Sequence, residues 1–233
     1  MKKASVETKQ RRRKNGQIRE AWRRMVHNKK AVGAMIVLAI LLFIVIFADF
    51  ISPYSKGTEL DVINRLIAPC KEYWFGTDAY GRDLFTRIIH GSRMSLLMGF
   101  GATFISATIG TLIGTTSAYL GGRTDSIIMR LLDMWMAIPS LLVTLAIIAG
   151  VGVGIPQMIG ALAFGGIPGF ARVLRASALG VVNQEFIESA RALGAKSSRI
   201  VVKYIIPNVM SQFLVQSTMN VSGTILLGAT LSF

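Results

Sequence analysis

The sequence predicts an all-α membrane protein, a polytopic bundle of helices. Hydrophobic residues make up 52% of the 233 positions and charged residues only 16%, whereas soluble domains carry about a quarter charged residues. The 23 glycines agree with this class, because glycine is frequent in membrane helices and lets their backbones approach closely. Backbone polar groups in lipid must be satisfied within each segment, so we expect the membrane spans to be helical.

Basic residues are concentrated at the start of the chain. Twelve of the 26 Lys and Arg lie in residues 1–30, directly before the first apolar stretch. A net charge of +14 can indicate nucleic-acid binding, but cytoplasmic positive charge beside a membrane span explains this position better. No basic and aromatic surface recurs later in the sequence. We therefore expect residues 1–30 to be a basic cytoplasmic region, and we expect no nucleic-acid partner.

The first transmembrane helix is predicted at residues 31–51. Residues 31–48 are 18 consecutive residues without a charged or strongly polar side chain. At about 1.5 Å rise per residue they nearly cross a hydrocarbon core of about 30 Å. Asp49 and Pro53 follow and mark the far interface. Residues 52–93 then mix charges of both signs, which indicates an extracytoplasmic loop.

Residues 94–233 are predicted to supply four further spans. The first of them contains Gly110 and Gly114 in the GxxxG spacing that suits close helix contact. Glycines and a proline at 150–156 divide the next apolar stretch in two. Residues 172–206 regain charge and are expected to form a cytoplasmic loop. The four spans are expected at about 94–120, 130–150, 156–171 and 207–233.

The distribution of positive charge predicts the orientation. With a cytoplasmic N-terminus, 20 of the 26 Lys and Arg fall in cytoplasmic segments and six in the loop at 52–93. Cytoplasmic loops carry the excess of Lys and Arg. We therefore expect five spans in all, with the N-terminus inside.

The sequence offers no catalytic or metal-binding set. His27 and His90 are the only histidines, and neither is paired with a nucleophile. Cys70 is the only cysteine, which excludes an intrachain disulfide and a multi-cysteine cluster. A phosphate-binding G-x-x-x-x-G-K-[ST] loop is absent, so nucleotide hydrolysis by this chain is not expected. Asp49 and Asp133 lie at predicted helix ends, where a carboxylate reaches water or pairs with a neighbour.

Residues 183–209 have the signals of a helix followed by a turn. Asn183 can cap the start of the helix, and Glu185 and Glu188 lie in its first turns, where the helix dipole favours anions. Gly194 can end the helix in the left-handed conformation.

One face of this predicted helix is apolar. Phe186, Ala190 and Leu193 recur at i, i+4 and i+7 and therefore share a face. Such a face either docks into the groove of a partner or lies against the protein's own surface, and the residues leave both open.

The same segment resembles the Glu-Ala-Ala loop of ABC importer permeases. That pattern is Glu-Ala-Ala, three residues, Gly, nine residues, Ile, one residue and Leu-Pro. The spacing is kept over 20 positions, and the substitutions are Ser189, Tyr204 and Ile206. The positions that the resemblance assigns to ATPase coupling are Glu188, Ser189, Ala190, Leu193, Gly194, Ile206 and Pro207.

A motif in the 52–93 loop narrows the resemblance to the C-type permease of the oligopeptide, dipeptide and nickel transporter family. That family has a GTD-x-x-GRD-x-x-x-R signature, and the resemblance extends from about residue 22 to residue 233. The motif either lies near a docked binding protein or fixes the loop structurally. It is matched by Gly76, Thr77, Asp78, Gly81, Arg82, Asp83 and Arg87.

The resemblance implies a function and a set of partners. It implies the ABC importer type I permease fold of six helices, in a membrane-spanning permease subunit of the bacterial or archaeal inner membrane. The importer is expected to be ATP-driven and to take up peptides delivered by an extracytoplasmic solute-binding protein. The implied partners are that protein, a sister permease, two cytoplasmic ABC ATPases and membrane lipid. ATP and Mg would belong to the ATPases, so no cofactor is expected on this chain.

The resemblance also implies a role for residues 188–193 and a continuation of the chain. The helix would be a coupling helix seated in an ATPase groove, moving with ATP-driven closure of the ATPase pair. A sixth helix is expected beyond Phe233. The chain is therefore expected to be incomplete, with its last residue outside, and not to transport as it stands.

Other functions stay open at this point. A permease of the same family can carry nickel or another small solute, because selection lies largely with the binding protein. A secondary transporter or channel is a further alternative, but midplane charges would favour it and they are missing. A truncated chain can also be a scaffold that does not transport. Co-purification with an ATPase separates the ATP-driven importer from the last two.

Overall fold

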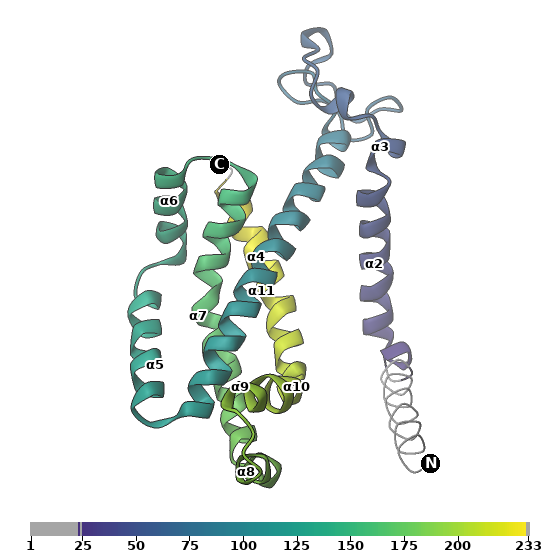
Figure 1. Cartoon of the computed structure of the whole chain (residues 1–233). Coiled ribbons are helices and arrows are strands. Elements are labelled where there is room, and N and C mark those ends of the chain that lie inside the picture. Colours follow the sequence, from purple (N-terminus) through teal and green to yellow (C-terminus); the bar gives the residue numbers. More distant parts are fainter. Residues whose placement is uncertain (1–22, 24, 232–233) are drawn as a thin grey trace. The chain divides into compact units, whose positions relative to one another are not determined.

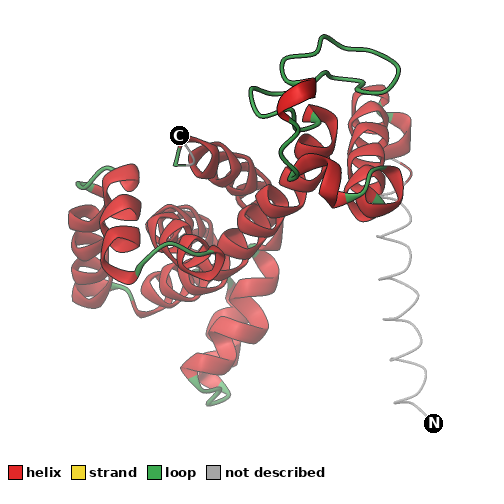
Figure 2. Cartoon of the chain, turned by 90° about the horizontal axis from the view of Figure 1, so that it is seen from above, coloured by secondary structure: helices red, strands yellow, loops and turns green. Residues whose placement is uncertain are grey.

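The structure is a computed structural model that describes residues 23 and 25–231, and its regular elements are helices (Figures 1 and 2). Within these residues no strand occurs, and one isolated antiparallel bridge joins Thr77 and Asp83. The all-α prediction is therefore confirmed. Of the predicted basic region 1–30, residues 1–22 and 24 lie outside the described residues. The chain forms two compact units, Met1–Arg93 and Met94–Phe233.

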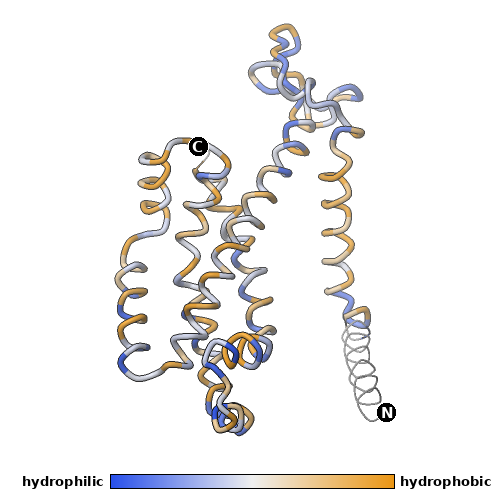
Figure 3. Tube along the Cα trace, in the orientation of Figure 1, coloured by the Kyte–Doolittle hydropathy of each residue, from blue (hydrophilic) through white to orange (hydrophobic). Residues whose placement is uncertain are grey.

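The first unit begins with α2 (Lys29–Ile46), the predicted first span. Asn28 caps this helix, because its side-chain oxygen accepts a hydrogen bond from the Lys30 amide at 3.1 Å. None of the α2 residues is buried, and Figure 3 shows apolar residues along the helix beyond the two lysines at its start. A helix that is apolar on every side suits a lipid environment.

Beyond α2, the first unit consists of short elements and the beginning of a long helix. The short elements are α3 (Ala48–Ile51), η1 (Tyr54–Gly57) and η2 (Val62–Asn64). The long helix is α4 (Leu84–Leu120), which starts ten residues before the predicted 94. It starts early because the Asp83 carboxylate accepts hydrogen bonds from the Phe85 and Thr86 amides at 3.3 and 3.1 Å. The loop predicted at 52–93 therefore ends at 83.

In the second unit, α7 (Ile155–Val182) contacts α5 (Gly122–Met136), α6 (Ser140–Val151) and α11 (Met210–Thr230) (Figure 1). The 150–156 break is confirmed, because α6 ends at Val151 and α7 begins at Ile155.

The predicted GxxxG contact is confirmed between α4 and α7. A Cβ added to Gly110 would lie 2.5 Å from the Cβ of Phe170. One added to Gly114 would lie 2.2 Å from the carbonyl oxygen of Ala171. Only glycine allows the two backbones to approach this closely.

The main core of the second unit joins α7 to the segment that follows it. Phe170 and Leu174 of α7 are fully buried together with Ile187, Ile200 and Ile205. Burial of a large aliphatic or aromatic side chain contributes about 1.5–3 kcal/mol. The segment after α7 is therefore fixed to the helix that precedes it.

The span predicted at 130–150 is two helices and not one. Helices α5 and α6 are separated at residues 137–139 and meet at an angle of 79°. Pro139 explains the break, because proline lacks a backbone N–H and disfavours a helical residue before it.

The helix predicted at 156–171 continues to Val182, so the first part of the predicted 172–206 loop is helical. The return of charge at Arg172 had indicated the end of the span. In the structure Arg172 and Arg175 project from α7 and form ion pairs with carboxylates of α5. Paired charges do not require the helix to end, and Pro168 lies within it without ending it.

Three described helices are long and apolar enough to cross a membrane: α2, α4 and α7. The bent pair of α5 and α6 would make a fourth span. Helix α11 has 21 residues but is not among them, because Gln212, Gln216 and Asn220 lower its hydropathy. The fifth span, predicted at 207–233, therefore stays a prediction.

Candidate functional site

The first candidate site is the segment between α7 and α11. It contains α8 (Glu185–Ala192), α9 (Ser197–Ile200), the π-helix η3 (Val201–Ile205) and α10 (Ile206–Asn208). We call residues 183–209 the coupling segment, and all seven residues of the predicted Glu-Ala-Ala set lie within it.

The ends of α8 agree only in part with the sequence. Glu185 and Glu188 lie in the first turn as predicted. Asn183 does not cap α8, because it closes the end of α7 and Gln184 occupies the N-cap position. Gly194 ends the helix as predicted, with φ of +75°.

The end of α8 is a Schellman motif. The Gly194 amide donates to the Arg191 carbonyl at 2.9 Å, and the Ala195 amide donates to the Ala190 carbonyl at 3.1 Å. A residue with a Cβ is strained at the positive φ of Gly194, although space is available there. The Glu-Ala-Ala pattern therefore needs glycine at position 194 for its backbone conformation, not for lack of space.

Helix α8 has one buried and one exposed face. Ile187 is fully buried and Ala190 is 8% exposed, and both belong to the core of the second unit. Leu193 is 88% exposed and Phe186 is exposed as well. The apolar face predicted from Phe186, Ala190 and Leu193 is therefore divided, because Ala190 faces inward.

The exposed side of α8 is partly polar. Glu188 and Ser189 are exposed, and the Ser189 hydroxyl donates to the Glu185 carbonyl at 2.9 Å. Arg191 places its guanidinium carbon 4.7 Å from the centre of the Tyr119 ring at the end of α4. Cation–π contact thus joins α8 to a second helix of the unit.

The coupling segment returns to α11 through the π-helix η3. Tyr204 and Ile206 pack against the core, whereas Pro207 is exposed. The Asn208 side-chain amide donates to the Tyr204 carbonyl at 2.6 Å. A π-turn widens the helix ahead of Pro207, whose ring cannot continue the ordinary hydrogen-bond ladder.

The second candidate site is the loop at residues 52–83, which lies in the first unit with the GTD and GRD motif. Gly76 and Gly81 have φ of +76° and +77°. A Cβ on Gly81 would lie 1.7 Å from the carbonyl oxygen of Asp61, and one on Gly76 would lie 2.4 Å from that of Ile67. Both positions therefore require glycine.

Thr77 and Asp83 fix the path of this loop. The Thr77 hydroxyl donates to the Asn64 carbonyl at 2.5 Å and accepts from the Ile67 amide at 2.9 Å. Asp83 is 5% exposed and caps the beginning of α4. Thr77 therefore connects two parts of the loop, and Asp83 connects the loop to α4.

The Asp78 carboxylate lies between two positively charged side chains. Its carboxylate forms ion pairs with Arg82 at 2.8 Å and with Arg87 of α4. Burial alone would raise the pKa of Asp78, but hydrogen bonds from the Arg82 side chain and backbone, the Tyr80 amide and Arg87 lower it to about 2. All seven motif residues therefore have contacts or conformations that fix the loop.

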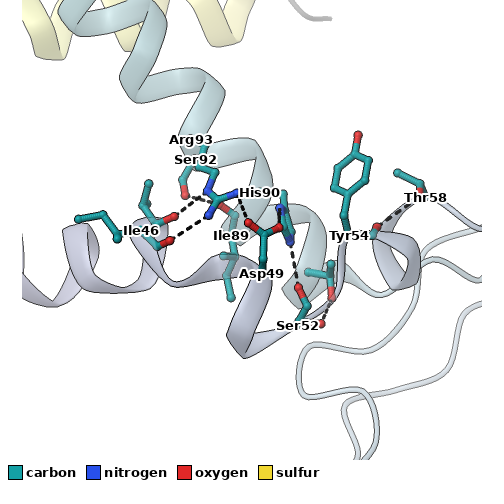
Figure 4. A network of polar contacts seen from close by, with 11 residues as sticks. Ile46, Asp49, Ser52, Tyr54, Thr58, Ile89, His90, Ser92 and Arg93 are labelled. Carbon is teal, nitrogen blue, oxygen red and sulfur yellow. Dashed lines mark hydrogen bonds and ion pairs between the residues drawn. The ribbon is translucent and has the colours of Figure 1, made fainter.

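A further polar network in the first unit was only partly expected from the sequence (Figure 4). Arg93 donates to Asp49 at 2.7 Å and to the carbonyls of Val45 and Ile46. The hydrogen bond from Arg93 lowers the pKa of Asp49. The prediction that Asp49 pairs with a neighbour at a helix end is confirmed.

His90 belongs to the same network and lies on α4, not in a loop as expected. It is 8% exposed, and its Nε2 atom lies 3.0 Å from the Ser52 carbonyl oxygen (Figure 4). These contacts connect the end of α3 with the first turns of α4.

Two ion pairs connect α5 with α7. Arg175 forms a two-point ion pair with Asp125, and the Ser117 hydroxyl of α4 donates to the same carboxylate at 2.6 Å. Arg172 pairs with Asp133 at 2.5 Å, as the prediction for a helix-end carboxylate allows. No local signal pairs these residues, because the two carboxylates are eight residues apart on α5 and the two arginines three apart on α7.

The described residues contain no cluster of His, Cys, Asp or Glu that could hold a metal ion. Cys70 is exposed and free. Buried packing holds the coupling segment to α7, whereas ion pairs and hydrogen bonds hold the 52–83 loop.

Comparison with known proteins agrees with these features. The family described as binding-protein-dependent transport system inner membrane component matches residues 106–233. The N-terminal TM domain of oligopeptide transport permease C matches residues 16–69.

Curated relatives cover nearly the whole chain. A glutathione transport system permease protein GsiD of Escherichia coli is 39% identical over 92% of this chain and 71% of the relative. A dipeptide transport system permease protein DppC of Alkalihalophilus pseudofirmus is 37% identical over 92% of this chain and 70% of the relative. The chain therefore belongs to the binding-protein-dependent transport system inner membrane components, the permease subunits of ABC transporters.

Proposed function

We propose that this chain is the permease subunit of an ATP-driven importer that carries peptides delivered by an external solute-binding protein. Membership of the permease family supports the transport role. The names of the relatives, which refer to glutathione and to a dipeptide, support a peptide substrate.

The proposed importer contains further subunits. Two cytoplasmic ABC ATPases bind ATP and Mg, and a sister permease completes the pathway through the inner membrane. The N-terminus lies in the cytoplasm, because this orientation places 20 of the 26 Lys and Arg inside. The coupling segment is then cytoplasmic, and the 52–83 loop faces the binding protein.

The division of α8 into two faces is the observation that carries this proposal. Ile187 and Ala190 anchor the helix in the core of the permease, while Leu193 at its end is 88% exposed. An anchored helix with an exposed apolar residue suits docking into a partner's groove. In this account Leu193, Glu188 and Ser189 contact the ATPase.

Movement of α8 is transmitted to the membrane helices through the packing around it. The core joins α8 to α7 through Leu174 and Ile187, and Arg191 joins it to α4 through Tyr119. Tightly packed elements move together because interiors are close-packed. ATP-driven closure of the ATPases would therefore shift α7 and α4, and through η3 it would shift α11.

The experiment is capture of the ATPase subunits by tagged permease in mild detergent. Leu193→Asp is compared with Val153→Asp, because Val153 is also 88% exposed but lies between α6 and α7. We expect wild type and Val153→Asp to capture the ATPases and Leu193→Asp to lose them. Equal capture by the two variants would contradict docking through α8.

The 52–83 loop has a structural role in this proposal. Each motif residue satisfies a contact or a backbone conformation within the loop or with α4, as the Asp78 cluster illustrates. The loop thereby holds a fixed shape on the side from which the binding protein delivers its peptide.

A further inference from the structure

The second unit contains a cavity of about 400 Å³ between α6, α7 and α11. This volume lies within the range of small-molecule sites, about 300–1,000 Å³. Its polar lining comes from Ser140, Gln216, Asn220 and Thr224, and Leu162 and Met219 contribute apolar surface. None of the described residues that line it is charged.

The polar groups of α11 face the cavity together. Gln216, Asn220 and Thr224 recur every four residues and therefore share one face of the helix. Gln216 and Asn220 are two of the three residues that make α11 less apolar than the other long helices. Uncharged polar side chains on a long helix either hydrogen-bond to a neighbouring helix or offer hydrogen bonds to a ligand beside it.

Hydrogen bonds fix the orientation of the Asn220 amide. Its oxygen accepts from the Thr103 hydroxyl of α4 at 3.0 Å and from the Thr224 hydroxyl at 3.3 Å. Its nitrogen lies 3.3 Å from the position that a Cβ on Gly166 would occupy, and Gly166 lines the cavity. Among the described residues this nitrogen has no hydrogen-bond acceptor, so its two N–H groups are available to a ligand.

Glycines keep the space beside this amide open. A Cβ on Gly166 would crowd Ser106 at 3.0 Å and approach the Asn220 nitrogen. Gly223 also lines the cavity, and a Cβ there would meet no atom within 4 Å. No described side chain therefore fills the space beside Gly223, and this space belongs to the cavity.

We propose that this cavity binds the main-chain amide groups of the transported peptide. The inference rests on the proposed function. The Asn220 N–H groups donate to a peptide carbonyl, and Gln216 offers both a donor and an acceptor, which complements an adjacent peptide bond. Main-chain amides are common to all peptides, and the flexible Met219 accommodates different side chains.

The test uses a single thiol in the assembled importer, with sister permease, ATPases and binding protein in lipid nanodiscs. Cys70→Ser removes the only cysteine of this chain, and cysteines of the other subunits are replaced as well. Gly223→Cys then places a thiol in the cavity, and Ser222→Cys places one on the neighbouring exposed residue of α11 as the control. Labelling by N-ethylmaleimide is timed with dialanine, with S-methylglutathione and with free alanine.

We expect either peptide to slow labelling at position 223 at least threefold and to leave position 222 unchanged. Free alanine, which has no peptide bond, is expected to have no effect. Adding Asn220→Leu is expected to abolish the protection. Equal labelling rates with and without both peptides would overturn the proposal, and so would a thiol at position 223 that cannot be labelled because another helix covers it.

ATP-dependent uptake of the same peptides, measured on the Cys70→Ser importer in proteoliposomes, separates the two claims. Uptake without protection at position 223 contradicts only the binding site. Protection without uptake supports the site and contradicts the proposed function, and the absence of both contradicts both.

Discussion

The guanidinium of Arg191 on α8 lies over the ring of Tyr119 at the end of α4, with 4.7 Å between the guanidinium carbon and the ring centre. This contact joins the exposed helix of the coupling segment to a helix that packs along α7 through Gly110 and Gly114. A docking event at α8 therefore has a direct connection to two long helices of the second unit.

Tyr119→Leu removes the aromatic ring beneath Arg191 and tests this connection. Cation–π contacts at exposed sites contribute about 0.5–1 kcal/mol, so we expect the permease to fold and assemble. The peptide transported per ATP hydrolysed should fall, because α8 then moves without α4. Tyr119→Phe keeps the ring and should retain the wild-type ratio, and a ratio unchanged by Tyr119→Leu would show that the contact does not transmit movement.

Asp125→Asn breaks the partly buried ion pair with Arg175, whose side chain is 27% exposed. Loss of a hydrogen-bonded charge pair is expected to lower the free energy of unfolding by about 1.5–3 kcal/mol. Thermal unfolding in detergent measures the effect. Asp133→Asn is the matched control, because the side chains of Asp133 and Arg172 are 62% and 49% exposed. Such an exposed pair is expected to contribute only about 0–1 kcal/mol.

Gly114→Ala tests the close packing of α4 on α7. The added Cβ would lie 2.2 Å from the Ala171 carbonyl oxygen, and overpacking of this kind costs about 1–3 kcal/mol. Gly160→Ala on α7 meets no atom within 4 Å and is expected to be neutral or to stabilise by up to about 1 kcal/mol. Similar melting temperatures for both variants would contradict a tight α4–α7 contact.

Asp78 gives the 52–83 loop a predictable dependence on pH. Its pKa is lowered from 3.8 to about 2 in the folded protein, so its contribution to stability is complete above pH 3.8. The contribution is lost as pH falls towards 2, because the carboxylate must then be protonated. The difference in melting temperature between wild type and Asp78→Asn should be constant above pH 3.8 and should shrink below it. A difference that does not change with pH would contradict the charge cluster.

The fold class could be predicted from the sequence and both motifs could be located in it, because long apolar stretches and the spacing within a motif are local signals. The 150–156 break, the close contact at Gly110 and Gly114 and the left-handed Gly194 are all local in the same sense, and the structure has each of them.

The features that the sequence did not reveal depend on contacts between distant residues. The charges of Arg172 and Arg175 predict an end of the span before the true end of α7, because each arginine pairs with a carboxylate on α5 that is distant in the sequence. The inward direction of Ala190 follows from the core that Ile187, Ile200 and Ile205 form after folding. The bend at Pro139 does have a local signal, the proline itself, whereas the pattern of charges contains no sign of it.

The proposed importer function is tested by ATP-driven uptake of radiolabelled dialanine into proteoliposomes that contain this chain, its sister permease and the ATPases, with binding protein on the side opposite the ATPases. We expect uptake that needs both ATP and the binding protein, and its loss in Leu193→Asp but not in Val153→Asp. Such uptake would contradict the expectation from the resemblance that the chain does not transport as it stands. Uptake that proceeds without ATP, or that is the same in both variants, would contradict the proposed function.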